Sequence, residues 1–355
     1  MRTLRSVVVP PKVAALAAAV LIAGPLSGQE VERISGRSVA VYNLAGQVQI
    51  VRGSGPDVVV RITRGGSDAS ELRVETGVVR DRSSLRIIFP SDEIVYPELG
   101  RGSNTTVSVR GDGTFSDGDN ERGDRVRIQG RGNGFEAWAD LVIEVPEGKD
   151  FALYVAVGEV EATGITGDLR IDTGSGGVTA TGITGSLEID TGSGSIMARD
   201  INEDLGVDTG SGRVEVSGVT GRRIEIDTGS GGVSGSRLEA DALTVDTGSG
   251  SIELESVTAA DISLDTGSGS IDIELMSDVD RLEADTGSGS ITVRAPADLG
   301  ARIEIDTGSG GIDLGFPIEV RSVRRDHVVG TVGDGRGDIT IDTGSGTVRL
   351  IRSGS

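Results

Sequence analysis

The sequence contains no cysteine, and aromatic residues make up only 3% of its 355 residues. Without cysteine there is no disulfide bond, thiol nucleophile, Cys-ligated zinc or lipid attachment through an N-terminal cysteine. His327 is the only histidine, which argues against a catalytic triad with histidine and against a multi-histidine metal site. So few large aromatic side chains predict a thin core of Ile, Leu, Val and Ala, punctuated by turns at the 56 glycines.

Basic residues are also scarce, because 34 Lys and Arg oppose 55 Asp and Glu and give a formal net charge of −21. Nucleic-acid binding depends on neutralising phosphates, and adsorption to anionic lipid depends on basic side chains. The charge therefore argues against nucleic acid and an anionic membrane surface as partners. It leaves cation binding and simple solubility open.

Long apolar runs are absent apart from residues 13–23. Arg2 and Arg5 precede this run, and the small residues Ser27 and Gly28 follow it. The order is typical of a secretory signal peptide, and the run is shorter than the ~20 residues of a membrane-spanning helix. We predict a signal peptide over residues 1–28, with an uncleaved anchor as the alternative. After cleavage we expect no membrane span and a protein that is periplasmic, on the cell surface or secreted.

One pentapeptide, Asp-Thr-Gly-Ser-Gly, is abundant and occurs nine times, with intervals of 18, 18, 19, 19, 19, 20, 21 and 36 residues. Apolar pairs with a spacing of two stand before and after it, for example Leu169/Ile171 and Val178/Ala180. That spacing is typical of β-strands, and such a unit buries its apolar face only by stacking on its neighbours. The copies begin at Asp172, Asp190, Asp208, Asp227, Asp246, Asp265, Asp285, Asp306 and Asp342.

The pattern predicts an all-β fold, a parallel β-solenoid (β-helix) of about ten coils with an N-terminal β-strand cap region. Residues 151–355 are the expected solenoid domain with a C-terminal cap, and residues 157–160 read as a worn first coil. The interval of 36 residues holds one unit without the motif, interpreted as a bulge or end cap. Residues 29–150 are the expected N-terminal β-strand region, with an exposed loop over 97–134.

Within the pentapeptide, the glycines permit a tight reversal, and the aspartate side chain can accept backbone hydrogen bonds in an Asx-type turn. The threonine and serine hydroxyls can bond to their copies in the next coil. Asp-Thr-Gly-Ser also occurs at aspartic-protease active sites, but that chemistry needs two carboxylates that share a proton in a cleft. Nine identical copies supply no such pair, so we predict no catalytic residue. An ice-binding threonine ladder is a further alternative, disfavoured because these threonines lie in turns.

Calcium is the one cofactor that the sequence leaves open, since stacked carboxylates repel one another and hard cations prefer oxygen ligands. The aspartates of the repeat are one candidate site. A second candidate is the acidic loop that contains Asp112, Asp117, Asp119 and Asp124.

The exported N-terminus and the repeats of the form Leu169-x-Ile-Asp-Thr-Gly-Ser-Gly-x-Val178 resemble the bacterial putative-adhesin family, a domain-of-unknown-function group. The resemblance covers about residues 39–350. It implies a β-solenoid of the cell envelope, and it supplies neither a ligand nor catalytic residues. Our hypothesis is an exported, non-enzymatic adhesin-like or scaffold protein that presents a repetitive β-face to an envelope protein or glycan. The alternative is a carbohydrate-active β-helix enzyme that acts on acidic polysaccharide.

Overall fold

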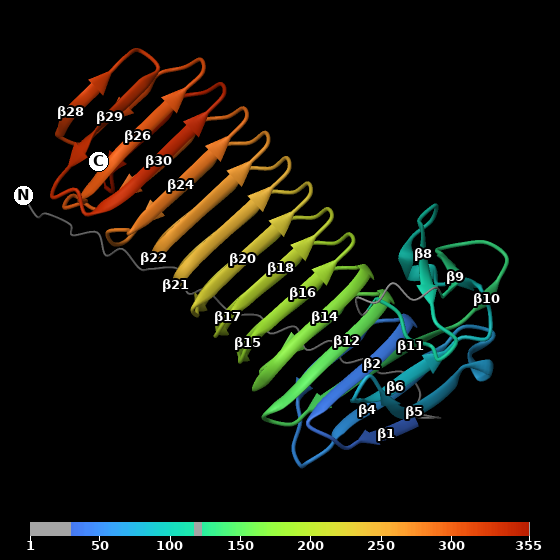
Figure 1. Ribbon diagram of the computed structural model, residues 1–355. Helices are drawn as coiled ribbons and strands as arrows, with labels where there is room; N and C mark the ends of the chain where they lie inside the picture. The colour runs from blue at the N-terminus through green and yellow to red at the C-terminus, as the bar shows by residue number, and fades with distance from the viewer. Residues whose placement is uncertain (1–29, 117–122, 355) are drawn as a thin grey trace, which may run out of the picture.

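The computed structural model describes residues 30–116 and 123–354, so the expected signal peptide over 1–28 lies outside the described residues. The described chain is all-β, as predicted, and has no α-helix, only short 3-10 turns at Ala69–Glu71 and Pro97–Leu99. A 27-stranded, solenoid-like sheet and a separate 4-stranded sheet account for its strands. Figure 1 shows the large sheet as a long rod, with the small sheet beside its N-terminal end.

The rod is built from two rows of parallel strands, one before and one after each pentapeptide. The first row contains β12 (Lys149–Val157), β14 (Gly167–Ser175), β16 (Leu187–Thr191), β18 (Leu205–Thr209), β20 (Arg223–Thr228), β24 (Arg281–Thr286), β26 (Ala301–Thr307) and β30 (Gly337–Thr343). The second row contains β13 (Val160–Thr163), β15 (Val178–Thr184), β17 (Ile196–Asn202), β19 (Val214–Thr220), β23 (Ile271–Leu275), β25 (Ile291–Ala295), β27 (Ile312–Leu314) and β31 (Val348–Arg352). The long strands β21 (Val233–Thr247) and β22 (Ile252–Thr266) serve both rows.

Neighbouring copies of the motif stack residue on residue, so that Asp172 pairs with Asp190 and Thr173 with Thr191. The same register continues along the rod. Because alternate strand residues point to opposite faces, the apolar pairs point inward and form one continuous core of Ile, Leu, Val and Ala. The motif threonine lies on this inner side and is buried in all nine copies. The motif aspartate therefore points outward.

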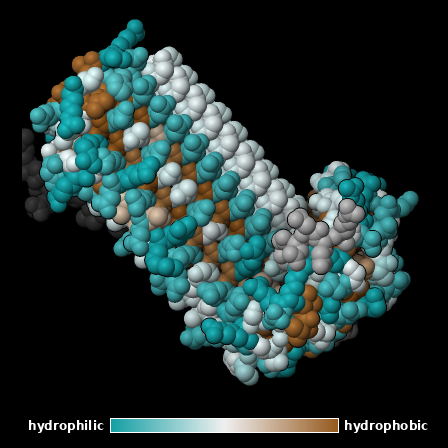
Figure 2. Space-filling model, viewed as in Figure 1, coloured by the Kyte–Doolittle hydropathy of each residue, from teal (hydrophilic) through white to brown (hydrophobic). Residues whose placement is uncertain are grey.

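Glycine is required in the turn because successive coils approach closely there. A Cβ atom on the second glycine of the motif would lie 1.9 Å from the carbonyl oxygen of the preceding copy, as for Gly250 against Gly231. The first glycine is also crowded, since a Cβ atom on Gly248 would lie 2.5 Å from the carbonyl oxygen of Gly229. A pale band of these Gly and Ser turns follows the edge of the rod at which the first-row strands end (Figures 1 and 2).

The rod begins before residue 150, because the segment 38–52 adds another layer. Here β2 pairs in parallel with β12, and β3 with β13, so the large sheet continues across residue 150. Antiparallel pairs of β4 with β1 and β11, and of β5 with β6, complete this end. Its strands are β1 (Glu30–Ile34), β2 (Ser38–Ala45), β3 (Val48–Arg52), β4 (Val58–Gly65), β5 (Arg73–Val79), β6 (Arg82–Ile88) and β11 (Trp138–Val145).

The segment 97–134, expected as an exposed loop, contributes two strands to the small sheet. The order in this sheet is β10-β7-β9-β8. Phe115 is buried (1% exposed) and its ring meets that of Tyr42 edge to face, which attaches the segment to the rod. The strands are β7 (Glu93–Val95), β8 (Asn104–Val109), β9 (Asp124–Gln129) and β10 (Phe135–Glu136).

At the C-terminal end the coils do not stack in sequence order. Strand β30, from the last copy of the motif, lies between β24 and β26, and β31 lies between β25 and β27. The unit without the motif is an antiparallel hairpin of β28 (Ile318–Val323) and β29 (His327–Val332), which pairs with β26 and ends the rod. The unit without the motif is thus an end hairpin and not a bulged coil. The final coil of β30 and β31 is inserted beneath the coil of β26 and β27.

The buried threonines give a matched pair of predictions. The Oγ1 atom of Thr266 donates to the carbonyl of Gly250 at 2.8 Å, whereas that of Thr209 is buried without a hydrogen-bond partner. An unpaired buried hydroxyl is costly, and valine has nearly the same shape. We expect Thr209→Val to raise the free energy of unfolding by about 1 kcal/mol and Thr266→Val to lower it by about 1 kcal/mol. Urea unfolding measures both, and two shifts of the same sign would contradict the assignment.

Candidate functional site

The most regular outward feature is a line of stacked carboxylates, which we call the aspartate row. Its members near the N-terminal end are shielded (Asp172 is buried and Asp190 half-buried), and those from Asp208 onward are exposed. The spacing follows the rise between strands, about 4.8 Å. In spatial order the row consists of Asp172, Asp190, Asp208, Asp227, Asp246, Asp265, Asp285, Asp342 and Asp306.

At each end of the aspartate row, the last aspartate pairs with a residue other than aspartate. At the N-terminal end Tyr154 pairs with Asp172, and its ring stacks on that of Tyr42 with centroids 4.6 Å apart. At the C-terminal end the only histidine pairs with the last aspartate, with His327 Nδ1 3.1 Å from Asp306 Oδ2. This contact cannot be detected in the sequence, because antiparallel pairing at the hairpin creates it.

The stacking raises the pKa of alternate members of the row. Although these side chains are exposed, partial desolvation of the carboxyls raises the pKa of Asp208, Asp246 and Asp285, and repulsion from the neighbouring aspartates raises it further. Hydrogen bonds from the turn N–H groups to these carboxylates, expected from the sequence, are not among the contacts of these three residues. The row thus resists full ionisation, whereas an Asx-type turn stabilises the carboxylate.

This difference predicts a pH dependence of stability. Because the pKa values of these carboxyls are raised in the folded state, their protonated forms stabilise the folded protein relative to the unfolded chain. This stabilisation is fully present below the ordinary pKa near 3.8 and is lost as the pH rises through the raised values. We expect the triple variant Asp208→Asn, Asp246→Asn, Asp285→Asn to raise the free energy of unfolding at pH 7 by roughly 1 kcal/mol after solvent screening. High salt should reduce this gain. Urea unfolding at pH 7 with and without 1 M NaCl tests both statements.

Asp338 is the matched control of opposite sign. Its hydrogen bond from Arg302, together with that positive charge, lowers the pKa of its carboxyl. The ionised carboxylate of Asp338 therefore stabilises the folded protein at pH values above the ordinary pKa, and this stabilisation is lost on acidification. Asp338→Asn should therefore lower the free energy of unfolding at pH 7. If the triple variant of the aspartate row were also destabilised at pH 7, the aspartates of the row would not repel one another.

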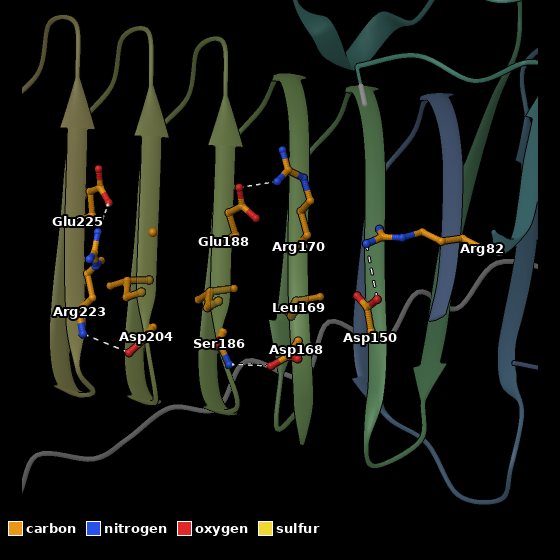
Figure 3. A pocket seen from close by; sticks show the side chains of 13 residues that line it. Arg82, Asp150, Asp168, Leu169, Arg170, Ser186, Glu188, Asp204, Arg223 and Glu225 are labelled. Atoms are coloured by element: carbon orange, nitrogen blue, oxygen red, sulfur yellow. Dashed lines mark hydrogen bonds and ion pairs between the residues drawn. The ribbon is translucent and has the colours of Figure 1, made fainter. Parts of the chain in front are cut away.

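Beside the aspartate row lies a shallow depression of about 320 Å³ on the first-row face, shown in Figure 3. It exists because Gly206 stands between Glu188 and Glu225 in the register, where the side chain that would fill the space is missing. Its base is the strand backbone at Leu169, Leu187 and Leu205, whose side chains are buried in the core. Its rim is charged and does not repeat from coil to coil: Arg82, Asp150, Asp168, Arg170, Glu188, Asp204, Arg223 and Glu225.

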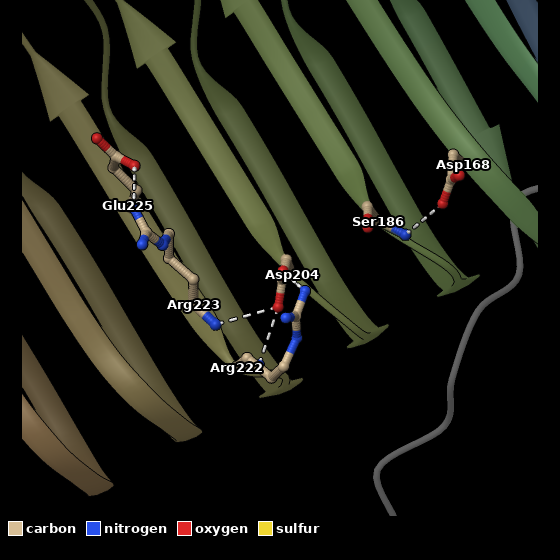
Figure 4. A network of polar contacts seen from close by, with 6 residues as sticks. All are labelled: Asp168, Ser186, Asp204, Arg222, Arg223 and Glu225. Carbon is tan, nitrogen blue, oxygen red and sulfur yellow. Dashed lines mark hydrogen bonds and ion pairs between the residues drawn. The ribbon is translucent and has the colours of Figure 1, made fainter.

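The rim charges are paired with one another. Arg170 bonds to Glu188, Arg82 lies 3.5 Å from Asp150, and Arg223 lies 3.9 Å from Glu225. Asp168 accepts the Ser186 N–H at 3.2 Å, as Figure 4 shows. The rim thus carries three arginines against five carboxylates, so the depression is a mixed-charge surface with an excess of negative charge.

Asp204 is the most heavily bonded carboxylate of the rim. It accepts the backbone N–H groups of Arg222 and Arg223 at 2.9 and 3.1 Å and the Arg222 guanidinium at 2.8 Å (Figure 4). Burial alone would raise the pKa of Asp204, but these bonds and the Arg222 charge outweigh burial and lower it. These bonds favour the ionised form of Asp204, whereas a general acid needs the opposite shift.

Of the four aspartates of the acidic loop, Asp112 and Asp124 lie in the described chain. Asp112 accepts the N–H and the hydroxyl of Thr114 at 3.0 and 2.7 Å, and its pKa is lowered by those bonds and by Arg86 and Arg110 against the opposing effect of burial. Asp124 begins β9, and Asp117 and Asp119 lie outside the described residues. Within residues 30–116 and 123–354, no three acidic or histidine side chains are grouped so as to hold a metal ion. The motif threonines are buried, which rules out an ice-binding face made of them.

Taken together, the fold and this face define an extended β-rod that exposes repeated and paired charges along its length. The chain belongs to the Toastrack DUF4097 family, whose model matches residues 100–350. No curated protein matches the sequence. In the described residues, no helix has the length and apolar character needed to cross a membrane.

Two solved structures are similar over most of the chain. One is described as a "putative cell adhesion protein" from Clostridium sporogenes ATCC 15579, with 10% identity and a TM-score of 0.18. The other is described as a "putative adhesin" from Bacteroides fragilis NCTC 9343, with 12% identity and a TM-score of 0.34. Each match covers 92% of this chain and 99% of the other chain.

Proposed function

We propose that this protein is an exported, non-enzymatic, adhesin-like or scaffold protein of the cell envelope, in which a parallel β-solenoid of about ten coils presents its first-row face to an envelope protein or glycan. The observation that carries the proposal is the rim of the depression. Its arginines are paired with carboxylates, and the carboxylate with the most bonds has a lowered pKa. Such a surface offers fixed donors and acceptors for recognition.

The proposed contact area is the depression together with the adjacent part of the aspartate row. The missing side chain at Gly206 leaves room for a sugar ring or an aliphatic side chain, and the paired rim charges supply hydrogen bonds around it. Export and placement in the periplasm, on the cell surface or in the medium rest on the sequence of residues 1–28.

A filling substitution tests this site. The Cβ position of Gly206 has no close neighbour, the nearest atom being Glu188 Cγ at 3.9 Å, so Gly206→Arg fills the depression and leaves the core intact. Thr244→Arg is the matched control, because Thr244 is exposed at the same register position beyond Glu225. On a glycan array and in pull-downs from envelope extract, we expect Gly206→Arg to lose the ligand that the wild type and Thr244→Arg retain.

The same array tests the enzymatic alternative. If the wild type depolymerises any acidic polysaccharide and Gly206→Arg does not, the protein is a carbohydrate-active enzyme and the proposal is wrong. If the wild type, Gly206→Arg and Thr244→Arg all bind the ligand equally, the depression is not part of the contact area.

A further inference from the structure

The outermost strand at the C-terminal end of the rod has an open edge. In the described chain β28 pairs only with β29, so its other edge faces solvent. Val320 and Val323 in this strand are 47% and 66% exposed, and they are two of the five large apolar side chains exposed in the described residues. An open edge with exposed valines favours pairing with another strand.

A bulge in β28 places both valines on one face. Val320 lies opposite Gly330, and Val323 lies opposite the buried Val328, with the register shift between residues 320 and 322. In a regular strand, residues three apart point to opposite faces, so the bulge brings the two valines to the inner side. Glu319 and Arg324 flank them and are exposed, and the Arg324 N–H bonds to the His327 carbonyl and fixes the turn.

The order of these residues is self-complementary. When two copies of β28 run antiparallel about a two-fold axis between residues 321 and 322, Val320 of each copy faces Val323 of the other. Glu319 of each copy then faces Arg324 of the other. Opposite-charge and apolar cross-strand pairs stabilise such an edge, and two-fold symmetry makes every contact twice.

At the opposite end of the rod, pairing of an edge strand about its centre lacks this complementarity. The edge strand β5 exposes Val78 (73%), but antiparallel pairing about its central Thr76 sets Arg73 against Val79. Arg73 is moreover already 3.8 Å from Glu75 of its own strand. Pairing about the centre of β5 therefore brings no opposite charges together.

We propose that the C-terminal end is a self-association surface, at which two copies join through antiparallel pairing of β28 with Glu319 opposite Arg324 and Val320 opposite Val323. The product is a closed, tail-to-tail dimer with the two depressions on separate arms. Such a dimer binds a repetitive partner bivalently and gains avidity without new contacts. This inference is independent of the identity of the ligand.

Charge reversal tests the register. Sedimentation velocity on the purified protein of 36.4 kDa should show a monomer–dimer equilibrium that depends on concentration. Glu319→Arg and Arg324→Glu should each weaken dimerisation at least ~10-fold, because each places like charges opposite one another twice. The double variant restores both pairs in reversed order and should return the wild-type dissociation constant. Circular dichroism shows that each variant is folded.

Four results would overturn the proposal. A wild type that stays monomeric at all concentrations excludes the interface. Single variants that dimerise like the wild type, or a double variant that fails to recover, exclude this register. Species that grow beyond the dimer with concentration indicate head-to-tail pairing with β5 of the next copy and exclude two-fold closure.

Discussion

Gly250→Ala is expected to lower the free energy of unfolding by about 3 kcal/mol, the upper range for forcing an added methyl group into a packed site. The new Cβ atom would lie 1.9 Å from the Gly231 carbonyl oxygen and 2.5 Å from the carbonyl carbon. Both atoms belong to the backbone of the preceding coil, so no side-chain rotation relieves the clash. The two coils must separate, which weakens the hydrogen bonds of the turn and the core contacts below it. Urea unfolding followed by circular dichroism measures the loss.

Gly232→Ser is the matched control, only one residue beyond the motif that ends at Gly231. A Cβ atom on Gly232 would meet nothing closer than the Ser251 carbonyl oxygen, at 3.5 Å. Serine already occupies the corresponding position in other coils, as at Ser195 and Ser251. We expect no measurable change. If Gly250→Ala were as stable as this control, the close stacking of the turns would be disproved.

Removal of residues 337–355 is expected to unfold more of the chain than it deletes. The deleted coil lies between β24 and β26 and buries Ile339, Ile341, Val348 and Leu350. Full burial of each such side chain contributes about 2 kcal/mol, and its loss also uncovers the coils on both sides. Residues 301–332 remain in the chain but lose the layer on which they stack. Hydrogen exchange should show that their amides lose protection.

The control is a shorter truncation after Ser353, which removes only two residues beyond the last strand. It should leave the exchange pattern unchanged. Retained protection over 301–314 in the long truncation would mean that β26 has moved down and stacked directly on β24, with Asp306 over Asp285. That result would contradict a requirement for the inserted coil.

The regular part of the fold was predictable because its information is local and repeated. Apolar pairs such as Leu169/Ile171 give the strand period, and the glycines of the motif mark the turn. Arg237 and Ser256 show the limit of that reasoning. They adopt φ values of 54° and 57° at the corner where Gly182 and Gly218 stand in other coils, and the sequence gives no sign of it. The register imposed by neighbouring coils holds them there.

The parts that escaped prediction depend on contacts between distant segments. The insertion of β30 under β26 was hidden because the motif is the same at Asp285, Asp306 and Asp342, so the sequence cannot order them in space. The depression also escaped prediction. Its only local sign is Gly206, which interrupts the outward position held by Glu188 and Glu225 in the adjacent coils.

The aspartate row gives the rod the character of a linear polyelectrolyte. One carboxyl every 4.8 Å or so along a straight line is a lower charge density than that of duplex DNA, with one charge per ~1.7 Å. The arrangement nevertheless concentrates cations along one side of the rod. A basic partner that lies along this side displaces those ions, so the logarithm of its affinity should fall linearly with the logarithm of salt concentration. The slope then counts the carboxylates that the partner covers.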